Sequence, residues 1–234
     1  TVDIMNLFSE LFEEYPFSNE KYGHAQFGWG GGMEHTTVSF MGNFSSSLIA
    51  HELAHQWFGN KITCGSWKDI WLNEGFATYL SGLVVENFET ENSFTSWKQS
   101  RVNSITSQPS GSVYISNNDT TVARVFSSRL SYSKGAMVLH MLRKKLGDEP
   151  FFQSLRDYLS DEDLSYSYAK TDDLKSIIEE STAEDVTEFF DDWIYGEGYP
   201  SYQINWSHNS QGNLNLEVSQ SQSHSSVDFF EGPI

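Results

Sequence analysis

Residues His51, Glu52 and His55 form an HExxH motif, which constrains the fold more than any other part of the chain. The motif lies in a stretch without Gly or Pro before Gly59, so we predict a helix over residues 48–60 that one of the preceding serines caps. Residues four apart lie one turn above each other on a helix, so both imidazoles can bind one metal ion. Glu52 then points to the flank of that ion, where a carboxylate can hold a water molecule as a base.

A catalytic metal needs a third protein ligand, and Glu74 is the candidate. Eighteen residues separate it from His55, enough for the first helix to end, turn at residues 63–65 and return as a second helix over 69–88. Two His and one Glu leave a fourth tetrahedral position for water, the open arrangement of a hydrolytic zinc site. An HExxH run can also be a chance match that merely packs, but here the helix pattern, the downstream Glu and the flanking residues agree. The sequence therefore predicts one zinc ion per chain on His51, His55 and Glu74.

The composition limits the partners of the chain. Its formal net charge of −18 argues against nucleic acid and against docking on anionic membranes. A solvated acidic surface explains this charge, and attraction of cationic substrates, such as peptides with free amino termini, would also use it. Cys64 is the only cysteine, so no internal disulfide or cysteine-based metal cluster is possible. No apolar run approaches the ~20 residues of a membrane span, so we expect no transmembrane segment.

Periodicity predicts a small sheet, a helical lobe and a change of character near the end of the chain. Residues 22–40 look extended around a glycine-rich turn at 28–32, and residues 112–131 look like a loop. Further helices are predicted at 3–15 and 93–106. A series of helices without strands between them is predicted to follow, at 134–146, 149–159, 172–180 and 184–195. Alternating residues predict strands at 202–207, 214–220 and 226–230. We expect an α+β fold in which a small mixed sheet lies beside the helical lobe, with zinc between them.

Three strands cannot close a sandwich by themselves, so we expect two domains. Residues 1–198 form the zinc-bearing catalytic domain, and residues 199–234 begin a β-rich, sandwich-like domain that is truncated here. The chain starts within a helical pattern and stops at Glu231-Gly-Pro-Ile, so we expect an excerpt of a longer protein. Serine- and asparagine-rich loops with one cysteine favour an exported protein, periplasmic or extracellular.

Two further positions carry chemistry that the residues alone leave open. Glu34 follows Gly31, Gly32 and Met33, and an extended glycine-rich segment can pair with a peptide while a carboxylate beyond it receives an ammonium group. A tight turn with a solvent-facing Glu fits the same residues. Tyr132 lies just before a predicted helix, where its phenol can donate a hydrogen bond to a developing oxyanion, or simply pack.

These motifs together resemble the aminopeptidase N family of zinc metallopeptidases, which are gluzincins. The resemblance covers the whole chain and rests on HELAHQWFGN, the 18-residue gap, WLNEGFATY, the Gly-x-Met-Glu turn and Ser-Tyr-x-Lys-Gly, in this order. It implies a thermolysin-like catalytic domain followed by the start of a β domain. It also implies that the N-terminal β domain and the helical C-terminal domain of the family are missing here.

The resemblance further implies a role for each site residue. Zinc would lie on the predicted ligands, Glu52 would be the general base and Tyr132 would stabilise the transition state. Glu34 would bind the amino terminus of a peptide substrate, and the Gly31-Gly32 backbone with Met33 would pair with the peptide. His35 stands where the family usually has Asn, and we expect this difference to reshape the end of the substrate cleft.

The expected function is therefore hydrolysis of the N-terminal peptide bond by a zinc-dependent aminopeptidase. Three alternatives stay open at this point. A thermolysin-like endopeptidase spaces its third ligand differently and lacks the Gly-Met-Glu turn. An epoxide hydrolase activity occurs in one branch of the family. A zinc-bearing binding module without turnover would have lost its base, yet Glu52 and Tyr132 are both present.

Overall fold

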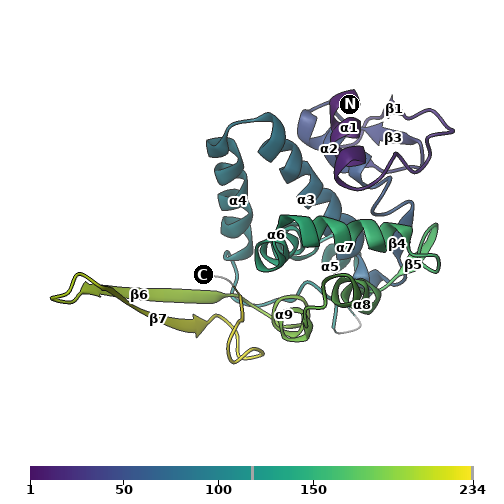
Figure 1. Cartoon of the computed structure of the whole chain (residues 1–234). Helices are drawn as coiled ribbons and strands as arrows, with labels where there is room; N and C mark the ends of the chain where they lie inside the picture. Colours follow the sequence, from purple (N-terminus) through teal and green to yellow (C-terminus); the bar gives the residue numbers. More distant parts are fainter. Residues whose placement is uncertain (117–118, 233–234) are drawn as a thin grey trace.

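The computed structural model describes residues 1–116 and 119–232, and it confirms the α+β prediction (Figure 1). A small three-stranded sheet lies beside a mostly helical lobe. The helices of the described chain are α1 (Val2–Leu11), α2 (Ser46–Ala54), α3 (Trp71–Phe88), α4 (Glu91–Ile105), α5 (Val122–Val125), α6 (Gly135–Leu146), α7 (Asp148–Ser160), α8 (Thr171–Thr182) and α9 (Thr187–Phe190). A 3₁₀ turn, η1 (Trp67–Asp69), and two π-helices, η2 (Ser128–Lys134) and η3 (Asp191–Tyr195), complete this set.

Helix α3 is the centre of the helical lobe. Every residue from Trp71 to Val84 is buried, and the helix packs against α2, α4, α6 and η2. A helix that is apolar on all sides is buried in the protein core, because it has no polar face to turn toward solvent. The ring of Phe76 on α3 stacks on Phe58 at a centroid distance of 4.3 Å, which fixes α3 against the segment that follows α2.

Helices α3 and α6 touch through their backbones at a pair of glycines. A Cβ placed on Gly75 would lie 3.1 Å from the Cα of Gly135 and 3.3 Å from the carbonyl oxygen of Ser131. These distances leave no room for a side chain without separation of the two helices. Gly75 directly follows Glu74, and Gly135 directly follows the π-helix that carries Tyr132.

The sheet confirms the predicted extended segment and its turn. Its strand order is β1 (Gly23–Gln26), β3 (Val38–Met41), β2 (Gly32–Met33), with β1 parallel and β2 antiparallel to β3. The turn before β2 places Gly31 at φ 80°, a left-handed conformation that favours glycine. Strand β2 is thus a short edge strand of the sheet.

The zinc-motif helix is shorter than predicted. Ser45 caps its start, since its Oγ accepts from the backbone N–H of Leu48 at 3.3 Å, but the helix ends at Ala54 rather than at Asn60. The chain then makes tight turns, in which the N–H of Asn60 bonds to the carbonyl oxygen of His55 at 2.8 Å. Helical periodicity in the sequence continues through such turns, which explains the overestimate.

Two short strands were not predicted. Strand β4 (Ile62–Cys64) occupies most of the predicted turn, and it pairs in parallel with β5 (Ser167–Ala169), which interrupts the predicted series of helices without strands. The two strands lie about a hundred residues apart in the sequence, and a strand of three residues is too short to show an alternating pattern.

The loop prediction for residues 112–131 is wrong in its second half. Helix α5 and most of the π-helix η2 lie there, while residues 117–118 of the predicted loop lie outside the described residues. The predicted strand at 226–230 is also wrong, because these residues form turns and irregular backbone. No helix among the described residues is both long and apolar enough to cross a bilayer.

A long hairpin projects from the helical lobe near the end of the chain (Figure 1). Strands β6 (Pro200–His208) and β7 (Leu214–Gln222) pair in antiparallel register, as in Ile204 opposite Val218. These two strands confirm the predicted strands at 202–207 and 214–220. The division into domains 1–198 and 199–234 stays a prediction.

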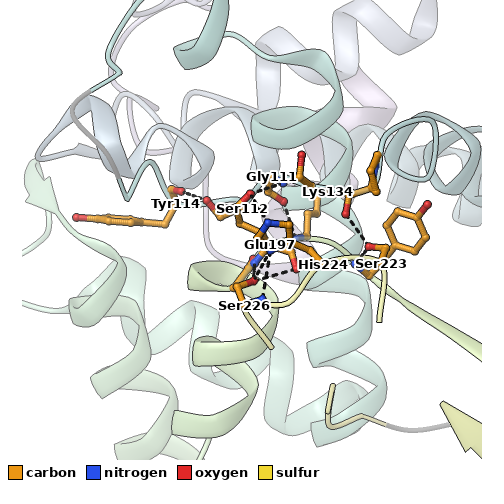
Figure 2. A network of polar contacts seen from close by, with 12 residues as sticks. Gly111, Ser112, Tyr114, Lys134, Glu197, Ser223, His224 and Ser226 are labelled. Carbon is orange, nitrogen blue, oxygen red and sulfur yellow. Dashed lines mark hydrogen bonds and ion pairs between the residues drawn. The ribbon is translucent and has the colours of Figure 1, made fainter. Parts of the chain in front are cut away.

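Polar contacts fasten the start of this hairpin to the π-helix (Figure 2). The Nζ of Lys134 donates to the carbonyl oxygens of Gly111 at 3.1 Å and Gly196 at 3.3 Å. The backbone N–H of Gly111 donates to Glu197 Oε2 at 2.9 Å, and the N–H of Glu197 donates to Ser226 Oγ at 2.8 Å. Lys134 is buried, and burial lowers its pKa to about 7.

Candidate active site

The structure brings His51, His55 and Glu74 together around one point. The Nε2 atoms of His51 and His55 are 3.2 Å apart, and Glu74 Oε2 lies 3.2 Å and 3.4 Å from them. Zinc at about 2.0–2.1 Å from its ligands in a tetrahedron separates them by roughly 3.4 Å. The donor atoms and their spacing therefore fit a zinc ion, with a fourth position open.

Local structure aims each donor. His51 and His55 stand one turn apart at the end of α2, and Glu74 lies in the first turn of α3. The Nδ1 of His55 lies 3.1 Å from the carbonyl oxygen of Phe58, so it donates there and directs Nε2 toward His51 and Glu74. This orienting hydrogen bond depends on the tight turn that ends the motif.

The charges of the three groups depend on each other. Burial opposes the charge on His55, but the carboxylates of Glu74, Glu34 and Glu52 together outweigh burial and raise the pKa of His55 to about 9. Burial alone would raise the pKa of Glu74, yet His55 and His51 hold it well below its usual range. For His51 burial prevails, and its pKa is lowered. Glu74 is therefore ionised at neutral pH, as a metal ligand must be.

Glu52 lies beneath the edge strand β2. Its carboxylate is buried against Gly32, where a Cβ would lie 2.5 Å from Glu52 Cδ, so a side chain at this position would have to displace the carboxylate. Burial raises the pKa of Glu52 to about 7; the charge of His55 opposes this shift and the charge of Glu34 adds to it. A pKa near the working pH suits a group that takes up and releases a proton.

Glu34 adds a third carboxylate to this part of the site. Oxygens of Glu34 and Glu52 and a nitrogen of His55 lie within 4.8 Å of one another. Asn60 Nδ2 and Gln56 Nε2 donate to the carbonyl oxygen of Glu34 at 2.7 Å and 3.4 Å, which fixes its backbone. No motif in the sequence predicted this function of the two amides.

The helix predicted just after Tyr132 is α6, which begins at Gly135, but Tyr132 itself lies inside the preceding π-helix η2 and not in a loop. Its ring stacks on that of His51 at a centroid distance of 5.9 Å and an interplanar angle of 8°. Burial raises the pKa of Tyr132 well above its usual value, and the negative charge of Glu74 raises it further. The phenol thus keeps its proton and can donate it to a hydrogen bond.

A cavity of about 1120 Å³ opens onto all these groups. Its wall includes the segment Gly31–Glu34, the motif residues, Tyr132 and the polar positions of α3, among them Thr78 and Ser81. Arg101 also lines this cavity, although it belongs to none of the sequence motifs. His35 is exposed against Phe40, with ring centroids 4.9 Å apart, and it is not among the described lining residues. The expected effect of His35 on the cleft stays a prediction.

Two imidazoles and a carboxylate from adjacent helices, with a second carboxylate on their flank, define the HExxH class of metallopeptidase sites. Comparison with known proteins identifies the family within this class. The Peptidase family M1 domain matches residues 30–193, which is more than half of the chain. The chain belongs to peptidase family M1, and the family implies a zinc cofactor that the donor set fits.

Relatives from plants illustrate this membership. The chain is 39% identical over 180 residues to Aminopeptidase M1-A of Oryza sativa subsp. japonica, a match that covers 74% of this chain and 20% of the relative. It is 35% identical over 183 residues to Aminopeptidase M1 of Arabidopsis thaliana, covering 75% and 20%. The chain thus spans about a fifth of the length of these curated relatives.

Solved structures confirm the thermolysin-like catalytic fold of the family. The M1 zinc metallopeptidase of Deinococcus radiodurans is 29% identical with a TM-score of 0.66, and the match covers 76% of this chain and 39% of that chain. Aminopeptidase A of Legionella pneumophila has a TM-score of 0.76 at 19% identity, over 93% of this chain and 26% of that chain, and is similar in fold.

Proposed function

We propose that this chain carries the active site of a zinc aminopeptidase, which removes the amino-terminal residue of peptides. His51, His55 and Glu74 would hold the zinc ion, Glu52 would be the base, and Tyr132 would be the donor to the oxyanion. The observation that carries the proposal is the place of Glu34, whose carboxylate lies within 4.8 Å of Glu52 and His55. A fixed carboxylate there would bind the ammonium group of a peptide one residue's length from the metal.

The chain's own groups suffice for the proton transfers of peptide hydrolysis. Bound zinc would polarise the scissile carbonyl and lower the pKa of the attacking water. Glu52 would take a proton from that water as its oxygen bonds to the carbonyl carbon, and would pass the proton to the leaving amine nitrogen as the C–N bond breaks. Tyr132 would donate a hydrogen bond to the carbonyl oxygen as it gains negative charge.

The edge strand supports an extended substrate. Strand β2 pairs only with β3 in the sheet, and Gly31, Gly32, Met33 and Glu34 line the cavity. Main-chain hydrogen bonds to such an edge hold a peptide in line with the metal site. One similar structure, an M1 zinc metallopeptidase variant of Deinococcus radiodurans, is bound to a Tyr-Ser-Ala substrate. It is 28% identical with a TM-score of 0.68, and the match covers 78% of this chain and 40% of that chain.

The test compares free and N-acetylated peptides with the full-length protein that contains this sequence. Zinc-loaded protein should cleave a free peptide and leave the acetylated one largely intact. Glu34→Ala should lose most of its efficiency on free peptides while it keeps its zinc, and the two changes should not add, because each removes the same contact. Glu52→Gln, with equal zinc content, should be inactive and so excludes a contaminating peptidase.

The alternatives correspond to other outcomes of this experiment. Equal cleavage of free and acetylated peptides would establish an endopeptidase and refute the aminopeptidase proposal. Hydrolysis of a lipid epoxide but of no peptide would establish the epoxide hydrolase alternative. Bound zinc without turnover of either substrate would establish a binding module.

A further inference from the structure

A single arginine lies in the wall of a cavity that also holds three carboxylates. Glu34, Glu52 and Glu74 line the cavity, and Arg101 on α4 is the one lysine or arginine among its described lining residues. It shares the wall with Thr78, which lies one turn of α3 beyond Glu74. A turn of helix advances about 5.4 Å, a distance comparable to one or two residues of an extended peptide.

The Arg101 guanidinium has no hydrogen-bond or ion-pair partner among the described residues. No carboxylate lies within ion-pair distance of it, and its Nε is buried without a hydrogen-bond partner. The other four arginines differ in this respect. Arg124 and Arg129 donate to backbone carbonyls, and Arg143 and Arg156 pair with carboxylates. A buried donor without a partner costs free energy, which a ligand can recover.

Packing holds this side chain in place. The guanidinium lies 5.3 Å from the centroid of the Trp97 ring, one turn earlier on α4. Trp97 in turn fills the space beside Gly82 of α3, where a Cβ would lie 2.6 Å from the indole. Stacking on a fixed aromatic ring orients the planar donors of an arginine in advance of binding. Burial lowers the pKa of Arg101, but an arginine remains charged in this range.

We propose that Arg101 binds a carboxylate of the substrate and thereby makes the site selective for peptides that carry one at this end of the cavity. The inference rests on the proposed aminopeptidase function. The amino terminus would lie at the acidic end beside Glu34, and the carboxylate would lie beside Arg101 and Thr78. The carboxylate belongs either to the carboxyl terminus of a short peptide or to an acidic side chain in one of its first two residues.

Matched substrate pairs separate these sources. The full-length zinc-loaded protein is given a tripeptide and its carboxyl-terminal amide, a peptide with Glu or Gln first, and a peptide with Glu or Gln second. In one of these pairs the wild type should prefer the carboxylate member. Arg101→Gln should lower kcat/KM for that member by about 10- to 100-fold, mainly through KM, and leave the neutral member nearly unchanged. Arg101→Lys, which keeps the charge without the planar fork, should restore part of the preference.

Lys98 provides the matched control. It lies on the same helix with its Nζ 4.6 Å from the ring centroid of Phe94, and it is not among the described cavity-lining residues. Lys98→Gln should leave all three preferences as they are. The ratio within a pair comes from one preparation, so it does not depend on the folded fraction of a variant.

The proposal is overturned if the ratio within every pair is the same in wild type and Arg101→Gln, or if Lys98→Gln changes the ratio equally. Failure of the proposed function gives a different result, because the wild type then cleaves neither member of any pair.

Discussion

Replacing Gly75 by alanine should slow catalysis without removing the metal site. The added methyl group would lie 3.1 Å from Gly135 Cα and 3.2 Å from Gly135 C, whereas carbon atoms pack best at about 3.5–4.0 Å. Helices α3 and α6 must therefore separate by roughly 0.5 Å. Because η2 runs directly into α6, Tyr132 moves away from Glu74 by a similar amount.

Two opposing terms set the effect on stability. Overpacking of this kind costs about 1–3 kcal/mol, and the higher helix propensity of alanine returns about 1 kcal/mol. The net loss of unfolding free energy should be about 0–2 kcal/mol, so the variant should stay folded. A displacement of ~1 Å near a reacting group can cost about 100-fold in rate, so roughly 0.5 Å should lower kcat by about tenfold.

The assay measures zinc content, the free energy of unfolding in urea and kcat on one free peptide. Gly30→Ala is the control, because nothing lies within 4 Å of a Cβ at Gly30, and it makes the same chemical change. Gly135→Ala should reproduce the effect from the other helix. A Gly75→Ala protein with wild-type kcat would show that the contact between the glycines does not set the position of Tyr132.

Three other predictions follow from the site and its support. Glu74→Ala should lose most of its zinc by elemental analysis, because only two imidazoles remain, and full retention would remove Glu74 from the ligand set. Tyr132→Phe should lower kcat by about 10²–10³ with little change in KM, and an unchanged kcat would show that Tyr132 only packs. The pKa of Lys134 is about 7 in the folded chain and about 10.4 when unfolded, so between these values the unfolded state binds more protons and stability rises with pH. Urea unfolding at pH 7 and pH 9 should show a smaller rise for Lys134→Met than for the wild type, and equal rises would contradict the assignment.

The parts of the site that depend on local spacing could be predicted from the sequence. His51 and His55 meet because they are one helical turn apart, and Glu74 joins them because two consecutive helices return to the same place. The small sheet was likewise predicted from one extended segment with a glycine-rich turn. In each case the contacts involve neighbours in sequence or two adjacent elements.

The missed features depend on contacts that no local pattern records. Ile62 pairs with Ser167 across the chain, and such a pair leaves no signal in three-residue strands. The π-helix at Ser128–Lys134 differs from an α-helix by its i→i+5 hydrogen bonds, which sequence periodicity does not distinguish. Arg101 lines the cavity while its guanidinium lies against Trp97, which packs beside Gly82, and local periodicity does not specify this contact between two helices.

The hydrogen bonds of Lys134 have a practical consequence for anyone who divides or recombines this chain. One of its acceptors, Gly196, follows the last helical residue, Tyr195, and the other belongs to the loop at Gly111. A cut before Gly196 would leave a buried ammonium group with a single acceptor, two residues from Tyr132. Chimeras that exchange the hairpin should therefore be joined after Gly198, so that Gly196, which accepts a hydrogen bond from Lys134 of the π-helix, stays in the same part as the metal site.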